Sequence, residues 1–128
     1  MSILEELIRI FDRYDVEVVV RKKSIRATHN DLPVSLIVRI PSKEKAVIEL
    51  RAEDELSDTL VDLVESEEDV EDIVDNVLSE LRDLAIEASK YLEDKGYNVV
   101  LNLREGENDV RDMLEEIREE YGSFEEEE

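Results

Sequence analysis

The chain has 128 residues, a formal net charge of -21 at pH 7, and hydrophobic residues at 41% of its positions. This length is enough for one domain with a buried core, and the hydrophobic fraction is too high for a disordered acidic chain. Recognition of phosphate rests on Lys and Arg, so the charge argues against direct binding of nucleic acid or an anionic membrane and favours a basic partner. The sequence contains no cysteine, which excludes disulfides, thiol catalysis and cysteine-bound zinc.

The first 51 residues predict one helix followed by an antiparallel meander. Apolar residues at helical spacing predict a helix over residues 3–13, with Ser2 as its N-cap and Glu5 completing a capping box. From Val16 the pattern changes to an alternation of apolar and polar residues, which is typical of half-buried strands. The expected strands are VEVVVRK from residue 16, SIRAT at 24–28, VSLIVRI at 34–40 and KAVIELR at 45–51, the last two joined by a hairpin loop at 41–45.

The remaining residues predict three helices and one more strand. A helix is expected from Glu53 to about Ser66, and a longer one over 68–95 that ends at Gly96, a favourable residue after a helix C-terminus. Tyr97, Val99, Leu101 and Leu103 alternate as a strand, and apolar spacing over 110–121 predicts the last helix. The apolar seam of the long helix is Val70, Val74, Val77, Leu81, Leu84, Ala88 and Tyr91. We expect this seam either to pack on the sheet or to form part of a dimer interface.

These elements define an α+β fold in the order α-β-β-(β)-β-α-α-β-α. The predicted sheet is an antiparallel meander of 3–4 strands with the final strand returning beside it, and helices packed on it. There is no internal repeat and no linker, so residues 1–122 are expected to form a single domain, followed by an acidic C-terminal tail at 123–128.

The charge is divided unevenly along the chain. Residues 1–51 contain ten Lys or Arg and eight Asp or Glu, a formal charge of +2, whereas residues 52–128 contain six and twenty-nine, a formal charge of -23. The predicted sheet is therefore near-neutral, and the predicted helical half holds nearly all of the negative charge. This division is the strongest functional signal in the sequence.

Six acidic residues at the start of the long helix form the candidate acidic binding face: Glu67, Glu68, Asp69, Glu71, Asp72 and Asp75. An EF-hand loop requires Gly at its sixth position, and ESEEDVEDIVDN at 65–76 has none, so no calcium site is predicted. One interpretation is a solvated helix face, with Ser66 as N-cap and the first-turn acids favoured by the helix dipole. Another is a surface that imitates a phosphate backbone, and a third is a binding face for a basic partner.

Basic residues gather in the meander, where Arg26, Arg39 and Arg51 are the candidate binding residues. Strand parity places Arg39, Glu49 and Arg51 on the face opposite the apolar side chains. Their function is either cross-strand charge pairing or contact with an acidic surface, including that of a second copy. His29 is the only histidine, and its place in a turn before a strand predicts a surface or capping residue. No metal site is predicted, because there is no second histidine to pair with it.

The order of a helix, a three-stranded meander, a helix, a strand and a helix resembles the core of the PD-(D/E)XK nuclease superfamily. The resemblance implies an Asp near the second core strand and a Glu-x-Lys on the third, which hold magnesium and position water. Asp31 and Glu49 match the two carboxylates, Arg51 stands where the family has Lys, and Glu5 or Glu6 would add another carboxylate. A guanidinium remains protonated and cannot act as a base, although it can stabilise charge, so the resemblance implies a nuclease whose motif is either degenerate or active. The same order is also similar to that of the small acidic dimeric chaperones of type III secretion.

We expect a non-enzymatic protein-interaction module, an adaptor or inhibitor, whose acidic helical half binds a basic protein surface. A homodimer is expected, and no cofactor, with Mg²⁺ required only if the chain is a nuclease. The N-terminal stretch MSILEELIRIFDRYD lacks the apolar block of a signal peptide, and no run of about 18 apolar residues predicts a membrane span. The chain has no Gln or Trp and is rich in Glu, Lys and Arg, as thermophile proteins are. We therefore expect a cytoplasmic protein from a thermophile.

Overall fold

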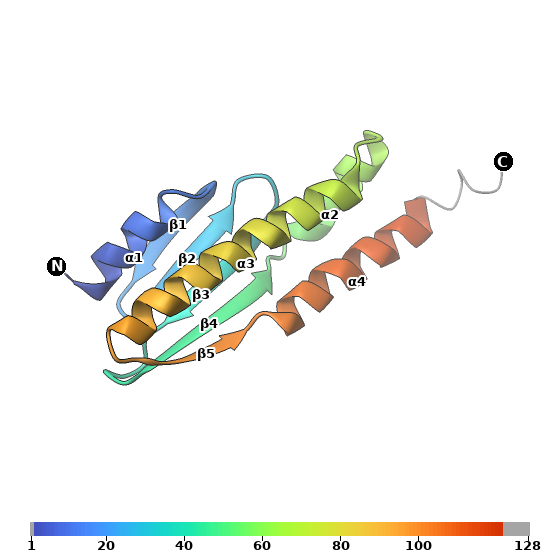
Figure 1. The fold of residues 1–128 in the computed structure, drawn as a ribbon. Helices are drawn as coiled ribbons and strands as arrows, with labels where there is room; N and C mark the ends of the chain where they lie inside the picture. The colour runs from blue at the N-terminus through green and yellow to red at the C-terminus, as the bar shows by residue number, and fades with distance from the viewer. Residues whose placement is uncertain (1, 122–128) are drawn as a thin grey trace.

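Residues 2–121 form a five-stranded mixed sheet and four helices in a computed structural model (Figure 1). The elements are α1 (Ile3–Phe11), β1 (Val16–Arg21), β2 (Ser24–His29), β3 (Val34–Arg39), β4 (Lys45–Ala52), α2 (Leu56–Glu65), α3 (Val70–Asp94), β5 (Asn98–Asn102) and α4 (Arg104–Tyr121). The α+β class, the order of elements and the packing of helices on the sheet are confirmed. The predicted acidic tail at 123–128 lies outside the described residues.

The sheet has the strand order β1-β2-β3-β4-β5. The first four strands form the predicted antiparallel meander, in which Ile25 pairs with Val38 and Val38 with Ile48. β5 pairs with β4 in parallel, with Ile48 opposite Leu101. Parallel neighbours need a crossover connection, and α2 and α3 together provide it, because α3 returns the chain to the end of the sheet at which β4 begins (Figure 1).

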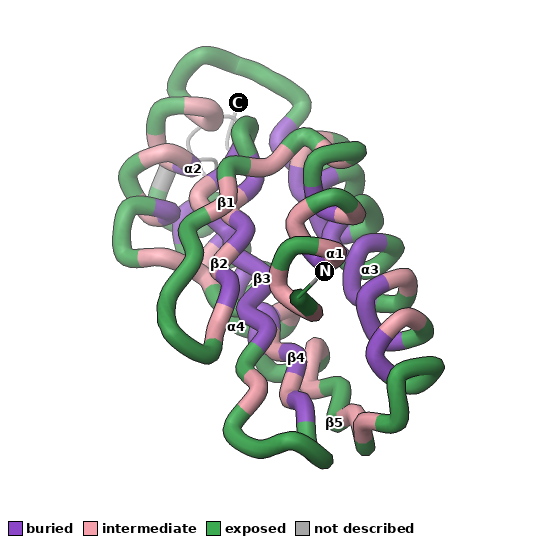
Figure 2. The backbone as a smooth tube through the Cα atoms, turned by 90° about the vertical axis from the view of Figure 1, so that its left-hand side faces the viewer, coloured by how far each residue is buried: buried purple, intermediate pink, exposed green. Residues whose placement is uncertain are grey.

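The core lies between this sheet and two helices. Figure 2 shows α1 and α3 on the same side of the strands, and their apolar side chains pack against Ile25, Leu36 and Ile48, which are fully buried. α3 is longer than the sheet, so its first turns extend past the strands, where they contact α2 and are linked to α4 by ion pairs (Figure 1). The predicted seam from Val70 to Ala88 is buried within the chain, and Tyr91 is partly buried. The seam therefore packs internally, which leaves a dimer interface to be sought elsewhere.

The turn between α2 and α3 differs from the prediction. Ser66 is the C-cap of α2 and does not cap the long helix. Glu67 follows with a φ of 60°, and Asp69 is the N-cap of α3, where its carboxylate accepts a hydrogen bond from the Asp72 backbone N–H at 3.3 Å. The prediction took the first good N-cap residue after α2, but the chain needs three more residues to reverse direction before α3 begins. At the other end of α3, Gly96 has a φ of +95°, as expected for a glycine that ends a helix.

α4 begins at Arg104, earlier than the predicted start at residue 110, and its first turns lie against β4. Gly106 lies in its first turns, and a Cβ built there would stand 2.1 Å from the carbonyl oxygen of Leu50. The glycine therefore allows the helix backbone to approach β4. Val110, Leu114 and Ile117 continue the buried face of α4. Within residues 2–121, no helix is both long and apolar enough to cross a membrane.

Candidate functional site

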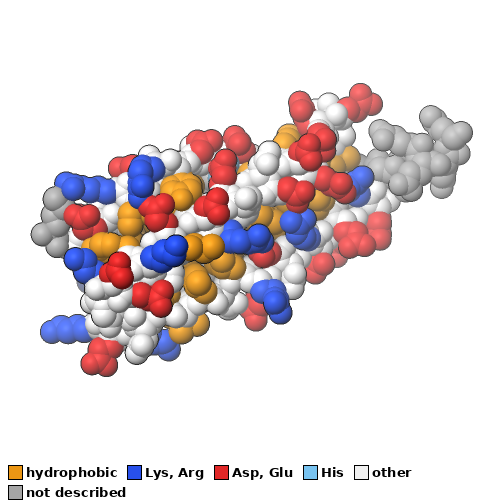
Figure 3. Space-filling model, in the orientation of Figure 1, with side chains coloured by type: hydrophobic (Ala, Val, Ile, Leu, Met, Phe, Trp, Pro, Cys, Tyr) orange, Lys and Arg blue, Asp and Glu red, His pale blue; other side chains and the backbone are white. Residues whose placement is uncertain are grey.

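The acidic face predicted from the sequence lies around the α2–α3 turn and along the first two turns of α3. In Figure 3, acidic side chains gather over this end of the molecule and along α4, whereas basic side chains are more frequent toward the other end. Glu67 and Glu68 stand in the turn, Asp69 caps α3, and Glu71, Asp72 and Asp75 follow on the helix, all of them exposed. The structure therefore brings the six predicted residues together on one surface.

The electrostatics of this surface are dominated by like charges. Asp69 raises the pKa of Asp72 above the ordinary value of 3.8, first through a hydrogen bond between the two side chains and then through its charge. Slight desolvation raises this pKa further, as do the charges of Asp75 and Glu71. The ionised form of Asp72 is thus disfavoured even though the residue is exposed to water. Part of this shift is repulsion between like charges, which a neighbouring cation would relieve.

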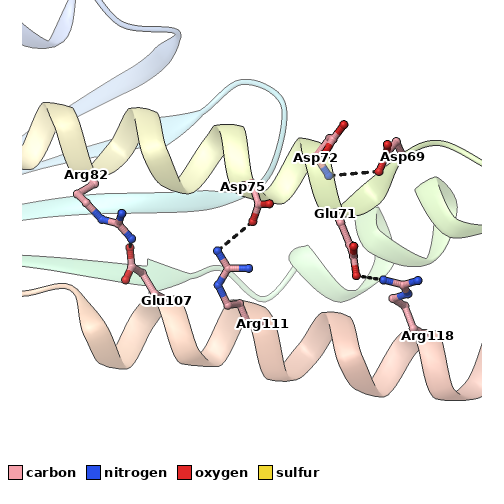
Figure 4. Close-up of polar contacts among 8 residues, drawn as sticks. All are labelled: Asp69, Glu71, Asp72, Asp75, Arg82, Glu107, Arg111 and Arg118. Carbon is pink, nitrogen blue, oxygen red and sulfur yellow. Dashed lines mark hydrogen bonds and ion pairs between the residues drawn. The ribbon is translucent and has the colours of Figure 1, made fainter.

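Part of the acidic face is already neutralised by arginines of α4 (Figure 4). Arg111 forms an ion pair with Asp75 at 3.0 Å, and Arg118 forms one with Glu71. A third pair joins Arg82 of α3 to Glu107. The order of these contacts shows that α3 and α4 run antiparallel, with the arginines linking them. Exposed pairs of this kind contribute about 0–1 kcal/mol each to stability, so their main effect is on which acids remain available.

The acids that remain available lie at the turn itself. Among the described residues, no ion pair involves Glu67, Glu68, Asp69 or Asp72. We call these four residues the acidic junction. They occupy a short segment between two helix ends, and the hydrogen bond from the Asp72 N–H to Asp69 holds that segment in place.

The predicted basic residues of the sheet also share one face. By the register of the strands, Arg26, Arg39 and Arg51 all lie on the face opposite α1 and α3. Arg39 is paired with Glu49, and Arg26 lies 3.3 Å from Glu53. For Arg39, the structure therefore shows the cross-strand charge pairing that was one of the two interpretations. For Arg26 the partner is an acid of the helical half, just beyond β4.

His29 is not the surface residue that the sequence analysis expected. It is 4% exposed, its Nδ1 accepts a hydrogen bond from the Asp31 backbone N–H at 3.0 Å, and its Nε2 pairs with Glu80 of α3. These two contacts select the tautomer with the proton on Nε2. The missed signal was parity, since His29 follows Ile25 and Ala27 at alternate positions of β2 and shares their buried face.

A second feature that the sequence analysis did not predict is a possible ligand cluster at this end of the sheet. Side-chain ligand atoms of Asp15, His29 and Asp31 all lie within 4.8 Å of one another. The Asp15 carboxylate already accepts a hydrogen bond from the Asn30 amide at 2.5 Å, and both ring nitrogens of His29 are engaged. The Asn30–Asp15 hydrogen bond ties the α1–β1 loop to the β2–β3 loop, and the contacts of His29 hold the start of that second loop against α3.

The residues matched to the nuclease motif lie in two places. Glu49 and Arg51 are on the open face of the sheet, where Glu49 is engaged with Arg39. Asp31 lies in the β2–β3 loop beside His29, whose ring packs under α3. A shared magnesium ion would need the Asp31 and Glu49 carboxylates on one side of the sheet, and the structure does not bring these two together.

Comparisons of the chain with protein-family models, with curated proteins and with solved structures find no match.

Proposed function

We propose that this protein is a non-enzymatic interaction module, an adaptor or inhibitor, whose acidic junction binds a basic protein surface. The observation that carries the proposal is the group of four adjacent exposed acids that the arginines of α4 leave unpaired. The raised pKa of Asp72 is consistent with it. The formal charge of -23 over residues 52–128 adds a long-range field of the same sign.

Repulsion within the acidic junction favours a cationic partner over a neutral one. A Lys or Arg side chain placed between Asp69 and Asp72 would stabilise both carboxylates in the ionised form. Binding would therefore lower the pKa of Asp72 and release a proton when the free protein holds one. The expected partner surface is rich in Lys and Arg, and association should be fast at low salt because the surrounding field steers the encounter.

The geometry also supports recognition beyond net charge. The acids project from a capped helix start and a short turn, so their positions are set by the backbone rather than by a long mobile loop. Arg111 and Arg118 hold α4 beside this site through their pairs with Asp75 and Glu71. Preorganised charges of this kind cost less entropy on binding than charges on a disordered segment.

A pull-down with the immobilised protein tests the proposal. Basic proteins from a cell extract should bind at low salt and be lost as the salt concentration rises, since the Debye length falls to about 3 Å at 1 M. The triple variant Glu67→Gln, Glu68→Gln, Asp72→Asn should retain less than about a tenth of this binding, because charge complementarity at rim-exposed groups governs the association rate.

The matched control removes the same amount of charge elsewhere. Asp12→Asn, Glu44→Gln and Asp94→Asn neutralise three exposed acids remote in sequence from the junction. This variant should keep most of the binding. Equal loss in both triple variants would mean that net charge alone is responsible, and partners that survive high salt would point to an apolar interface; either result contradicts the proposal.

A further inference from the structure

The outer edge of β1 has the features of an interface between two copies of the chain. β1 is the first strand of the sheet, so within residues 2–121 it has a neighbouring strand on one side only. Val19 and Val20 are each 45% exposed there, which is high for large apolar side chains. Natural edge strands are protected by Pro, Lys, bulges or a covering element. VEVVVR has neither Pro nor Lys, and its register with β2 is unbroken from Val16 to Arg21.

The backbone of β1 is oriented for a further strand. The carbonyl of Asp15 accepts a hydrogen bond from the Asn30 N–H at 3.0 Å, so it points toward the β2 side. Backbone groups alternate in direction along a strand, and Val18 and Val20 therefore direct their N–H and C=O groups away from β2. These two residues can exchange hydrogen bonds with a second strand.

We propose that two copies pair through their β1 edges, antiparallel, about a two-fold axis at Val19. In this register Val18 forms hydrogen bonds with Val20 of the second copy, and the two Val19 side chains meet at the axis. The register is selected by charge, because Glu17 then lies opposite Arg21 of the second copy, twice in the dimer. With the axis at Val18, Glu17 would lie opposite Val19 and Arg21 opposite Asp15, and with the axis at Val20, Arg21 would lie opposite Val19 and Glu17 opposite Lys23. Asp15 and Lys23 lie outside β1, so only the axis at Val19 pairs both charges within the two strands. The result is one continuous sheet made of two five-stranded sheets.

The other edge of the sheet fits this role less well. Val100 and Leu101 on β5 are also exposed, at 47% and 45%. β5 has Asn at both ends and no charged residue, so nothing in it would select a register. It also leads directly into α4, which carries much of the negative charge. β1 belongs to residues 1–51, whose formal charge is +2, and lies at the edge farthest from α4 (Figure 1). Two such edges can approach with little repulsion.

Sedimentation velocity over a range of concentrations tests the interface, at about 0.15 M salt, where the Debye length of about 8 Å screens the acidic halves. The unchanged chain should show a monomer–dimer equilibrium. Glu17→Arg alone and Arg21→Glu alone should each weaken dimerisation at least about tenfold, because two attractive cross-strand pairs become repulsive. The double variant restores opposite charges and should return to within about threefold of the unchanged chain.

Two valine variants locate the interface. Val19→Lys places two ammonium groups at the axis and should abolish the dimer, whereas Val100→Lys at the other edge should leave it unchanged. Circular dichroism of each variant shows whether the fold is kept, and the charge-swapped pair remains informative even if Val19→Lys unfolds. A chain that stays monomeric up to about 1 mM, a double variant that fails to restore the dimer, or a dimer lost only in Val100→Lys would each overturn the proposal.

Discussion

Replacing Gly106 with alanine sets two physical effects against each other. Alanine is favoured over glycine in a helix interior by about 1 kcal/mol, so an exposed helical glycine would gain stability from the change. At Gly106 the added Cβ would stand 2.1 Å from the oxygen and 2.5 Å from the carbonyl carbon of Leu50. Carbon atoms are best placed at about 3.5–4.0 Å, and backbone atoms of a paired strand cannot rotate away. α4 would have to move away from β4.

Overpacking of a core typically costs about 1–3 kcal/mol, and the clash with backbone places this site at the upper end. After the helix propensity is subtracted, Gly106→Ala should lower the free energy of unfolding by about 1–2 kcal/mol. For a chain of this length, the corresponding fall in Tm is about 3–10 °C. Thermal unfolding followed by circular dichroism measures it.

Asn108→Ala is the matched control, since Asn108 is an exposed residue of the same helix. It should gain about 0.5 kcal/mol from helix propensity alone. If Gly106→Ala were as stabilising as Asn108→Ala, the close packing of α4 on β4 would be refuted, and with it the position of the arginines that face the acidic half of α3.

Asp69→Ala should lower the free energy of unfolding, measured in urea, by about 0.5–2 kcal/mol because α3 loses its N-cap. Asp69→Asn keeps a side-chain acceptor and should lower it less, and equal losses would argue against the cap. The raised pKa of Asp72 means that the folded state holds this proton more tightly, so its contribution to stability is full below pH 3.8 and is lost as the pH rises through the raised pKa. Asp72→Asn should therefore be more stable than the unchanged chain above that pKa, and thermal scans from about pH 3 to pH 8 should show the difference vanish toward acid. His29→Phe should lower the free energy of unfolding by about 1–3 kcal/mol and speed amide hydrogen exchange at Asp31, because the Asp31 N–H loses its acceptor. Glu80→Gln keeps a contact to the ring and should lower the free energy of unfolding less. Similar exchange at Asp31 in both variants would contradict this arrangement.

Several parts of the candidate sites follow from local sequence. The clustering of the acidic junction is evident from the chain itself, because its four acids are within six positions of one another. Strand parity also sufficed to place Arg39, Glu49 and Arg51 on one face, since successive side chains of a strand point to opposite sides. The sequence did not predict which acids lack an ion pair, because Arg111 reaches Asp75 and Arg118 reaches Glu71 only once the fold has brought α4 beside α3.

By itself, the sequence determined the α+β class, the meander and the course of the long helix, because these depend on periodicities of 2 and 3.6 residues within short segments. Only the tertiary structure decided that β5 joins β4 in parallel, since that pairing depends on the direction in which α3 returns the chain. The early start of α4 at Arg104 and the burial of His29 against Glu80 were likewise set by contacts between distant segments. Asp69 rather than Ser66 caps α3 because Ser66 ends α2 and the turn takes up the residues between them. Local patterns indicate which face of a helix or strand is apolar, whereas the packing of the whole chain determines which other element covers that face.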